Sequence, residues 1–216
     1  MKIDIISDTV CPWCFVGKRR LEKALIQRPE VGFVVEWRPF QLNPGLPPEG
    51  MERQAYLAAK LGSAERATAI YAQISDAARP DNIEFNFEGI KQSPNTLASH
   101  CLIRWGATAG VQNLVVETLF KAFFEDGRDI GDKAVLAEIA DECGMEKALV
   151  QDLLARDADV ELIQKEEAIA RDMGISGVPF FIFDGKYSTS GAQDPQMFLQ
   201  IIDKLVEEQA EQAAAN

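Results

Sequence analysis

Two cysteines near the N-terminus have the spacing that dithiol chemistry requires. Cys11 and Cys14 enclose Pro12 and Trp13, and they follow a short β-branched segment over residues 2–7. Side chains three residues apart share a face in the first turn of a helix, so the two sulfurs can form a disulfide with little backbone movement. A helix N-terminus favours an anion, which predicts a nucleophilic Cys11 thiolate and a resolving thiol at Cys14.

Other uses of these cysteines have less support. A zinc site would need Cys101 and Cys143 as further ligands, but these two lie far apart in the sequence without a paired spacing. Haem attachment needs a histidine directly after the second cysteine, where this chain has Phe15. A pair of inert buried thiols is the remaining alternative. A redox dithiol is the favoured interpretation because the pair follows a strand and opens a helix, and no metal ligand is assigned.

The segments around the pair predict a βαβ unit that would hold it in place. Residues 2–7 read as a strand, and Pro12 suits the first turn of a helix that ends at Arg28-Pro29. Phe33–Trp37 reads as a second strand, closed by Arg38-Pro39. Strands joined by a helix in this way are expected to be parallel.

The middle of the chain has helical composition. A break rich in Pro and Gly over residues 43–50 precedes residues 51–174, which are rich in Ala, Leu, Glu and Lys. Ser93-Pro94 and Asp132 are predicted helix N-caps, and residues 83–87 have extended character. Helix ends are predicted at Gly110, Gly127, Gly144 and Gly174.

The C-terminal part returns to β character. Phe180–Phe183 follows Val178-Pro179 as a strand, Asp184-Gly185 is a hairpin signal, and residues 186–190 form the returning strand. A last helix is predicted to begin at Asp194-Pro195. Its apolar face consists of Phe198, Ile201, Ile202 and Leu205.

Neither β-containing end would bury enough surface alone, so we expect one sheet built from both ends. The order βαβ, helices, ββα predicts an α/β protein with a thioredoxin-like fold and a large all-helical insertion. The predicted domains are residues 1–45 with 175–216, which form a discontinuous thioredoxin-like domain, and residues 46–174, which form the helical insertion domain.

The composition excludes several classes of function. The 216 residues carry 34 acidic and 22 basic side chains, a formal net charge of −12. This surplus argues against binding to nucleic acid or to an anionic membrane, because both need clustered basic side chains. A single histidine rules out a metal site with several histidines from one chain. The N-terminus lacks a secretory pattern and no apolar run spans a bilayer, so a cytoplasmic location is expected.

Three segments together carry a resemblance to a known family. They are SDTVCPWCFVG over Ser7–Gly17, PNTLASH over Pro94–His100, and ISGVPFFIFDGKYSTSGAQ over Ile175–Gln193. The chain resembles the DsbA-like branch of thioredoxin-fold proteins, and within it the FrnE-type oxidoreductases. The branch also contains hydroxychromene-carboxylate isomerases and kappa-class glutathione transferases, which carry serine where this chain has Cys11. That departure favours dithiol chemistry here.

The resemblance adds expectations about the site. It implies that Pro179 follows a cis peptide bond and faces the cysteine pair, and that the backbone of Val178 pairs with an extended substrate or with glutathione. Asn95 and His100 lie in a segment that overhangs the active site in the family, so they are candidate substrate-binding residues. His100 would favour the thiolate or relay a proton, unless it packs or caps locally. Trp13 is expected to offer an aromatic surface beside the pair.

These observations predict a thiol–disulfide oxidoreductase that acts on a protein or small-molecule substrate. No tightly bound cofactor is expected, glutathione is a candidate co-substrate, and a homodimer is a candidate assembly. The alternative is a glutathione-dependent isomerase or transferase for a small aromatic substrate, which would not need Cys14. A third hypothesis is a non-enzymatic module that binds peptides along Val178-Pro179 without using either thiol.

Overall fold

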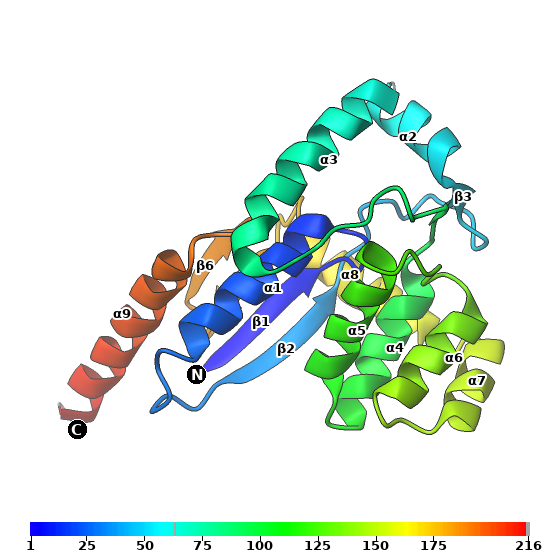
Figure 1. The fold of residues 1–216 in the computed structure, drawn as a ribbon. Helices are drawn as coiled ribbons and strands as arrows, with labels where there is room; N and C mark the ends of the chain where they lie inside the picture. The colour runs from blue at the N-terminus through cyan, green and yellow to red at the C-terminus, as the bar shows by residue number, and fades with distance from the viewer. Residues whose placement is uncertain (63, 215–216) are drawn as a thin grey trace.

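A central sheet is built from the two ends of the chain, as predicted. The computed structural model describes residues 1–62 and 64–214. The strands of this sheet are β1 (Lys2–Ser7), β2 (Val34–Pro39), β5 (Phe180–Phe183) and β6 (Tyr187–Ser190), in the order β2-β1-β5-β6 (Figure 1). β1 pairs with β2 in parallel and with β5 in antiparallel orientation, and β5 pairs with β6 in antiparallel orientation. This arrangement confirms the predicted thioredoxin-like α/β fold.

Helices flank the sheet and fill the middle of the chain. Those beside the sheet are α1 (Pro12–Leu25), α8 (Val160–Asp172) and α9 (Pro195–Ala214). The middle holds α2 (Arg53–Leu61), α3 (Ala64–Ala78), the 3₁₀ turn η1 (Arg79–Asp81), α4 (Leu97–Thr108), α5 (Gln112–Phe124), α6 (Lys133–Glu142) and α7 (Lys147–Ala155). A short strand pair, β3 (Met51–Glu52) with β4 (Gln92–Ser93), interrupts this helical insertion. α2 and the start of α3 project from the rest of the fold (Figure 1), whereas the end of α3 packs against α1, where Arg20 donates to the Ala77 carbonyl oxygen at 3.0 Å.

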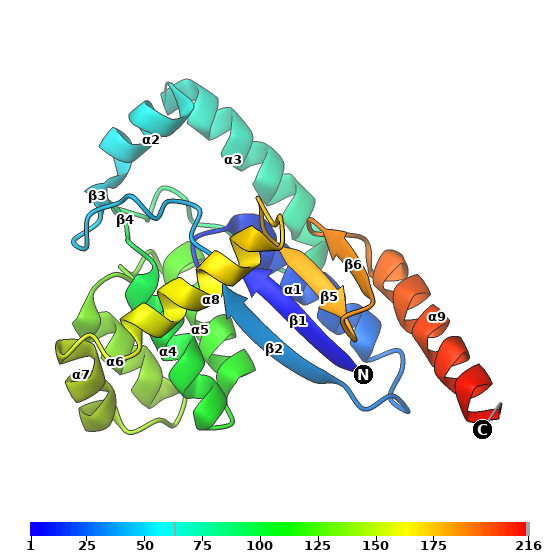
Figure 2. The same ribbon diagram turned by 180° about the vertical axis from the view of Figure 1, so that it is seen from behind.

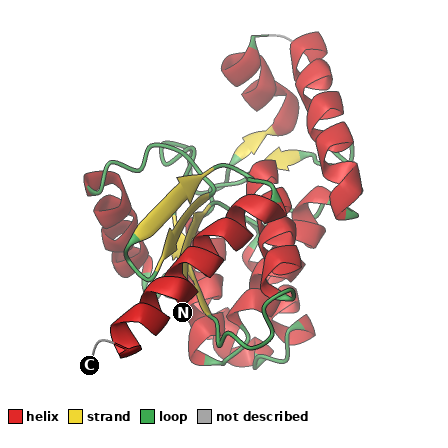
Figure 3. Cartoon of the chain, turned by 90° about the vertical axis from the view of Figure 1, so that its left-hand side faces the viewer, coloured by secondary structure: helices red, strands yellow, loops and turns green. Residues whose placement is uncertain are grey.

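Helices cover both faces of the sheet. α1 and α9 lie on one face, where Phe198 meets Phe181 with ring centroids 4.8 Å apart. Figure 3, in which C marks the end of α9, shows this helix in front of the strands. α8 crosses the opposite face (Figure 2), where Ala170 packs in a cluster with Ile6 and Phe40. The junction of β1 and α1 is therefore held between packed layers.

Local signals predicted most element ends. The backbone has positive φ at each of the predicted helix-terminating glycines, which are Gly110, Gly127, Gly144 and Gly174. Asp132 caps α6 as predicted, because its side chain accepts a hydrogen bond from the Ala134 N–H at 2.8 Å. The last predicted strand also forms, and Asp184 and Gly185 both adopt positive φ in the hairpin before it. β2 runs slightly further than predicted, with Pro39 as its last residue.

The predicted helix N-cap at Ser93-Pro94 is wrong. Ser93 lies in β4 opposite Met51, and its hydroxyl accepts a hydrogen bond from Arg53 at 3.0 Å. α4 begins only at Leu97, with Thr96 as its N-cap. Pairing with a distant segment outweighs the local capping signal here. Residues 83–87, expected to have extended character, contain no assigned strand although all of them are described.

The sheet and the helical insertion share one large hydrophobic core. Its buried members include Ile5 and Phe181 of the sheet, Phe15 of α1 and Phe120 of α5. The rings of Phe15 and Phe120 stack with centroids 5.2 Å apart. The division at residues 45/46 and 174/175 stays a prediction, since this core crosses it. Among the described residues, no helix has the length and apolar character needed to traverse a bilayer.

Candidate active site

The cysteine pair lies where β1 passes into α1. Cys11 is the N-cap of α1 with an extended backbone (φ −93°, ψ 111°), and Pro12 opens the helix. The Cys11 N–H donates to the Asp8 carbonyl oxygen and the Cys14 N–H donates to the Cys11 carbonyl oxygen, both at 3.0 Å. The first turn of α1, all of it described, contains no acidic side chain. The free N–H groups and the dipole of this helix end therefore favour a thiolate at Cys11.

The two thiols differ in their surroundings. Both are unbonded in this structure, and both residues are buried. Burial raises the pKa of the Cys14 thiol well above its ordinary value, and the neighbouring Cys11 raises it further. Hydrogen bonds from the Ser7 side chain and the Asp8 backbone lower this pKa without cancelling the rise. Cys14 consequently holds its proton near neutral pH.

The loop before β5 completes the site. The peptide bond between Val178 and Pro179 is cis, as the resemblance implied. The Cys11 thiol donates a hydrogen bond to the Val178 carbonyl oxygen, with 3.6 Å between Sγ and O. α1 approaches this loop closely at Gly17, where a Cβ atom would lie 3.1 Å from Pro179 Cγ and from Phe181 Cζ. The absence of a side chain at Gly17 thus lets α1 pack closely against the loop at Pro179, which lies beside Cys11.

Apolar surface is exposed near Cys11. Trp13 exposes 37% of its surface, although it lies between two buried cysteines in the sequence. Leu42 exposes 38%, and its N–H donates to Asp8 Oδ2 at 2.7 Å, which ties it to the segment before the pair. A partly exposed indole is suited to contact with an apolar or aromatic part of a substrate.

The structure pairs His100 with Asp8. Both side chains are buried, and His100 Nε2 lies 3.4 Å from Asp8 Oδ1. The same nitrogen forms a hydrogen bond of 3.1 Å with the Phe40 carbonyl oxygen. The carboxylate that accompanies the histidine is thus three residues before Cys11, and sequence analysis had not singled it out.

Asn95, the other candidate substrate-binding residue, is engaged in holding a loop. Its amide donates to the Leu46 carbonyl oxygen at 2.7 Å. Its Oδ1 accepts from the Leu97 N–H at 3.0 Å and from Gln41 Nε2 at 3.1 Å. These bonds join the start of α4 to the segment after β2. The Asn95 side chain therefore holds the structure together here instead of facing a substrate.

Residues 2–203 match the family of DSBA-like thioredoxin domains. The chain belongs to this family. It is also similar to the crystal structure of the probable DsbA oxidoreductase SCO1869 from Streptomyces coelicolor, with 30% identity and a TM-score of 0.87. That match covers 96% of this chain and 91% of the other. The resemblance to the DsbA-like branch is therefore confirmed, and the chain is an enzyme of the thiol oxidoreductase or isomerase kind.

Two more distant structures share the DsbA-like fold. 2-hydroxychromene-2-carboxylate isomerase has 16% identity and a TM-score of 0.72, with 98% of each chain covered. The cytosolic disulfide reductase DsbM from Pseudomonas aeruginosa with GSH has 16% identity and a TM-score of 0.68, covering 96% of this chain and 100% of the other. At this level of identity the similarity is one of fold.

Several side chains that nothing in the sequence singled out fix the loop after β2 in this DsbA-like chain. Beyond the Leu42 bond to Asp8, the Gln41 N–H donates to Glu167 Oε1 at 3.0 Å. Arg171 Nη2 donates to the Gln41 carbonyl oxygen at 2.7 Å and to Glu167 Oε1 at 2.6 Å. Asp8 had one local signal, its position between a buried strand and the cysteine pair. The spacing of Glu167 and Arg171 in the sequence indicates that they pair with each other on a helix, but nothing local indicates that both bind Gln41, which is far away in the sequence.

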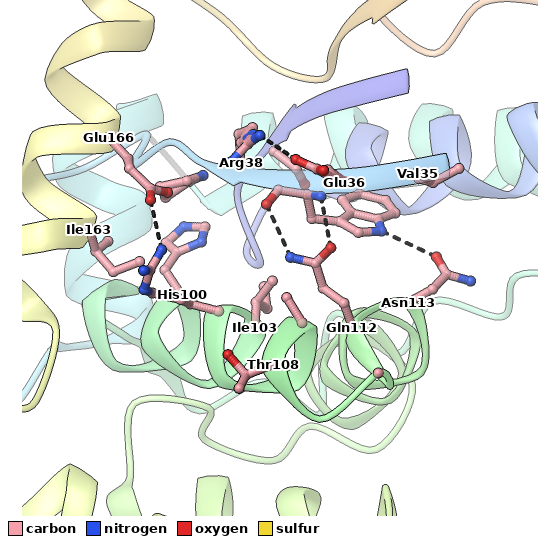
Figure 4. A pocket seen from close by; sticks show the side chains of 16 residues that line it. Val35, Glu36, Arg38, His100, Ile103, Thr108, Gln112, Asn113, Ile163 and Glu166 are labelled. Atoms are coloured by element: carbon pink, nitrogen blue, oxygen red, sulfur yellow. Dashed lines mark hydrogen bonds and ion pairs between the residues drawn. The ribbon is translucent and has the colours of Figure 1, made fainter. Parts of the chain in front are cut away.

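A cavity of about 470 Å³ opens between β2 and helices α4, α5 and α8 of the DsbA-like domain (Figure 4). Gln112 forms part of its wall and occupies the outer edge of β2. The Gln112 side chain accepts from the Trp37 N–H at 3.1 Å and donates to the Trp37 carbonyl oxygen at 3.3 Å. Asn113 accepts from the Trp37 indole N–H at 3.2 Å. The cavity extends inward to Ser7 and His100.

The other two cysteines have the properties of ordinary buried thiols. Burial raises the pKa of Cys101 in α4 to about 12. Burial also raises the pKa of Cys143, whose thiol donates to Thr118 Oγ1 at 3.4 Å. Within residues 1–62 and 64–214, no group of three or more His, Cys, Asp or Glu side chains is arranged to hold a metal ion.

Proposed function

We propose that this chain is a thiol–disulfide oxidoreductase that uses Cys11 and Cys14. The Cys11 thiolate attacks a substrate disulfide, which forms a mixed disulfide and releases one substrate thiolate. Cys14 then loses its proton and attacks the Cys11 sulfur, and the second substrate sulfur leaves as a thiolate. The substrate disulfide is reduced while the pair is oxidised, and the reverse sequence oxidises a substrate dithiol.

The contrast between the two thiols carries this proposal. Cys11 lies at the N-cap of α1, where the free N–H groups and the dipole of the helix favour an attacking thiolate, and its Sγ lies 3.6 Å from the Val178 carbonyl oxygen of the loop that faces it. Cys14 is fully buried behind it, and its raised pKa keeps it from competing as the first nucleophile. A resolving thiol needs this position, because it must reach Cys11 without meeting the substrate.

Two serine variants test the mechanism. Cys11→Ser should lower reduction of a model disulfide to the uncatalysed rate. Cys14→Ser should instead accumulate the mixed disulfide, which mass spectrometry of the intact protein detects. Full reductase activity in the Cys11→Ser variant would contradict the proposal. Titration of the pair against a glutathione redox buffer then gives the direction in which it operates.

Glutathione is the proposed co-substrate. DsbM was solved with GSH, and in this chain the backbone of Val178 next to Cys11 supports pairing with a short peptide thiol. A protein disulfide remains an alternative substrate, for which the exposed Trp13 offers contact area. A cytoplasmic location and a homodimer stay predictions.

A glutathione-dependent isomerase or transferase is the second candidate, and one cavity favours it. A space of about 860 Å³ lies between α2, α3 and residues 85–91. The rings of Tyr71 and Phe87 stack on its wall with centroids 4.1 Å apart, and Phe85 stacks on Phe87 at 4.8 Å. This lining suits a small aromatic substrate. The Cys14→Ser variant separates the candidates, because isomerisation should survive it and dithiol exchange should not.

A further inference from the structure

The buried position of Cys14 raises a question of proton transfer. In the resolving step the Cys14 sulfur gives up its proton while Cys11 is still bonded to the substrate. Cys14 exposes 1% of its surface, so the proton cannot pass directly into solvent. A neighbouring group must therefore accept it or pass it on.

Ser7 connects Cys14 with the cavity behind β2. Hydrogen bonding by the Ser7 side chain lowers the pKa of the Cys14 thiol, which places the two residues side by side, and Ser7 also lines the cavity of about 470 Å³. A hydroxyl both donates and accepts, so it can take one proton as it releases another. The cavity has the volume and the polar wall that water needs for hydrogen bonding.

His100 lines the same cavity and is set up to accept a proton. Its Nε2 bonds to the Phe40 carbonyl oxygen at 3.1 Å, and a carbonyl only accepts, so Nε2 carries a hydrogen. A neutral imidazole in this tautomer has Nδ1 as its acceptor. Phe40 also links the two residues through its N–H, which donates to the Ser7 carbonyl oxygen at 3.0 Å.

Asp8 is the charge that would stabilise His100 after it accepts a proton. Its Oδ1 lies 3.4 Å from His100 Nε2, in a side chain that is almost fully buried. Among the described residues this oxygen has no hydrogen-bond partner of good geometry, whereas Oδ2 accepts from the Leu42 N–H at 2.7 Å. A buried carboxylate oxygen with spare capacity needs an explanation, and a transient imidazolium beside it supplies one.

We propose that this cavity is the exit route for the proton of the resolving thiol, with Ser7 as the relay and His100, held by Asp8, as the acceptor. The inference rests on the proposed dithiol mechanism. The S–H bond of Cys14 breaks, its electron pair forms the bond to the Cys11 sulfur, and the substrate sulfur departs with the electrons of the old disulfide bond. The proton passes through Ser7 and cavity water to His100, and then to solvent.

The remaining charges near the cavity are paired. Arg38 Nε of β2 lies 2.9 Å from Asp4 Oδ1, and its guanidinium also bonds to Glu36. Arg104 of α4 bonds to Glu166 of α8 at 2.8 Å. The α5 residues on the wall, Gln112 and Asn113, carry no charge.

Two further groups face Asp8 and His100 from other elements. The charge of Asp8 raises the pKa of Tyr56 of α2, where burial is the main cause. The loop residue Phe40 offers His100 only an uncharged carbonyl. Asp8 is thus the charge in direct contact with His100. If His100 is the acceptor, the rate of the resolving step should depend on whether its imidazole is free to take up a proton.

The test measures formation and resolution of the mixed disulfide separately in the His100→Gln variant. Glutamine can still donate to the Phe40 carbonyl oxygen, but it cannot hold a second proton. Acid-quenched samples between about pH 5 and pH 9, analysed by mass spectrometry, follow formation and decay of the mixed disulfide. We expect formation to stay within about twofold of wild type, and decay to slow by roughly 10- to 100-fold with loss of the pH dependence that wild type shows.

A rescue experiment distinguishes proton transfer from a structural role. The cavity has room for imidazole, so added imidazole should restore decay of the mixed disulfide in His100→Ala. Glu167→Gln is the matched control. It alters a side chain that holds the same loop through the Gln41 N–H but lies outside the cavity wall, and it should leave the pH profile of decay unchanged.

Three outcomes would overturn the proton route. They are normal decay in His100→Gln, equal slowing of both steps with an unchanged pH profile, and a lack of rescue by imidazole in a folded His100→Ala protein. If the histidine variants do not fold, Ser7→Ala takes their place with the same expected change in decay. Failure of the proposed function gives a different result, since no mixed disulfide would then accumulate in Cys14→Ser.

Discussion

The outer and inner cysteines of the dithiol differ more in their surroundings than their three-residue separation suggests. On the outer side, Cys11 contacts the Val178 carbonyl oxygen and follows the segment to which the exposed Leu42 is tied. On the inner side, Cys14 is buried beside Ser7. One helical turn is enough to separate a thiol that contacts the loop at Val178 from a thiol that the core encloses. The order of the proposed steps is therefore set by packing and not by residue type.

The largest expected effect of this difference is on alkylation. Iodoacetamide should modify Cys11 at least about tenfold faster than Cys14 near pH 7, because burial raises the pKa of the Cys14 thiol and so depletes its reactive thiolate. Peptide mass spectrometry over a time course measures both rates. The Cys11→Ser variant should show only the slow rate of Cys14. Comparable alkylation rates at Cys11 and Cys14 would show that the two thiols do not differ in reactivity.

A buried ion pair that anchors α1 should matter next. Burial would raise the pKa of Glu117, but the hydrogen bond and charge of Lys18, with the charges of Arg19 and Lys121, outweigh it and hold the pKa below its ordinary value. Glu117→Gln should lower the free energy of unfolding by about 2 kcal/mol near pH 7, because it leaves the buried Lys18 with Glu22 alone.

The pH dependence of this loss has a defined sign. Glu117 stays ionised to lower pH in the folded chain than in the unfolded chain, so its contribution is present above the ordinary value of about 4.3 and is lost as pH falls through the folded value. Urea unfolding at several pH values should therefore show wild type and variant converging in acid. Glu138→Gln, in an exposed pair with Arg128, is the control and should change stability by less than about 0.5 kcal/mol.

Close packing between α1 and the loop at Pro179 should give a smaller effect. Gly17→Val should cost about 1–2 kcal/mol, because the added atoms meet Pro179 and Phe181. Chemical unfolding measures this cost, and Gly32→Ala, which places its Cβ in open space, is the matched control. Equal stability of the Gly17→Val variant and wild type would mean that the loop at Pro179 can move aside without lowering the free energy of unfolding.

The smallest effect is expected on the outer surface. Trp13→Ala should leave the free energy of unfolding within about 0.5 kcal/mol, since the side chain is partly exposed. It should raise KM for a protein disulfide by about two- to fivefold at unchanged kcat, because it removes contact area and no reacting group. Steady-state kinetics with a protein and with a small disulfide would localise the effect, which should be absent for the small one.

The sequence predicted what depends on short stretches of chain. Alternation and turn residues located β1, β5 and the Asp184-Gly185 hairpin, and the helix-ending glycines took the expected positive φ. The spacing of Cys11 and Cys14 predicted their shared position at a helix start. The cis bond before Pro179 came from the family resemblance, since position alone does not distinguish it from a trans bond.

Features that depend on distant partners were not predictable. Ser93 has a capping signature, yet it pairs with Met51 across the insertion. The lone histidine suggested a contact with the thiols, whereas its described partners are Asp8 and Phe40. Nothing local to His100 indicates a carboxylate that lies at the far end of β1. Such contacts exist only once the sheet has brought both ends of the chain together.

The amide of Gln112 has a consequence for solubility. The outer edge of a sheet is a template on which strands of other molecules can assemble, and proteins commonly protect it with charges or proline. Here the Gln112 side chain forms hydrogen bonds with both the N–H and the carbonyl oxygen of Trp37, as a neighbouring strand would. A strand of another molecule would have to displace the Gln112 amide, which belongs to the same chain, from the backbone of Trp37. β2 is thereby guarded against edge-to-edge aggregation by an uncharged residue.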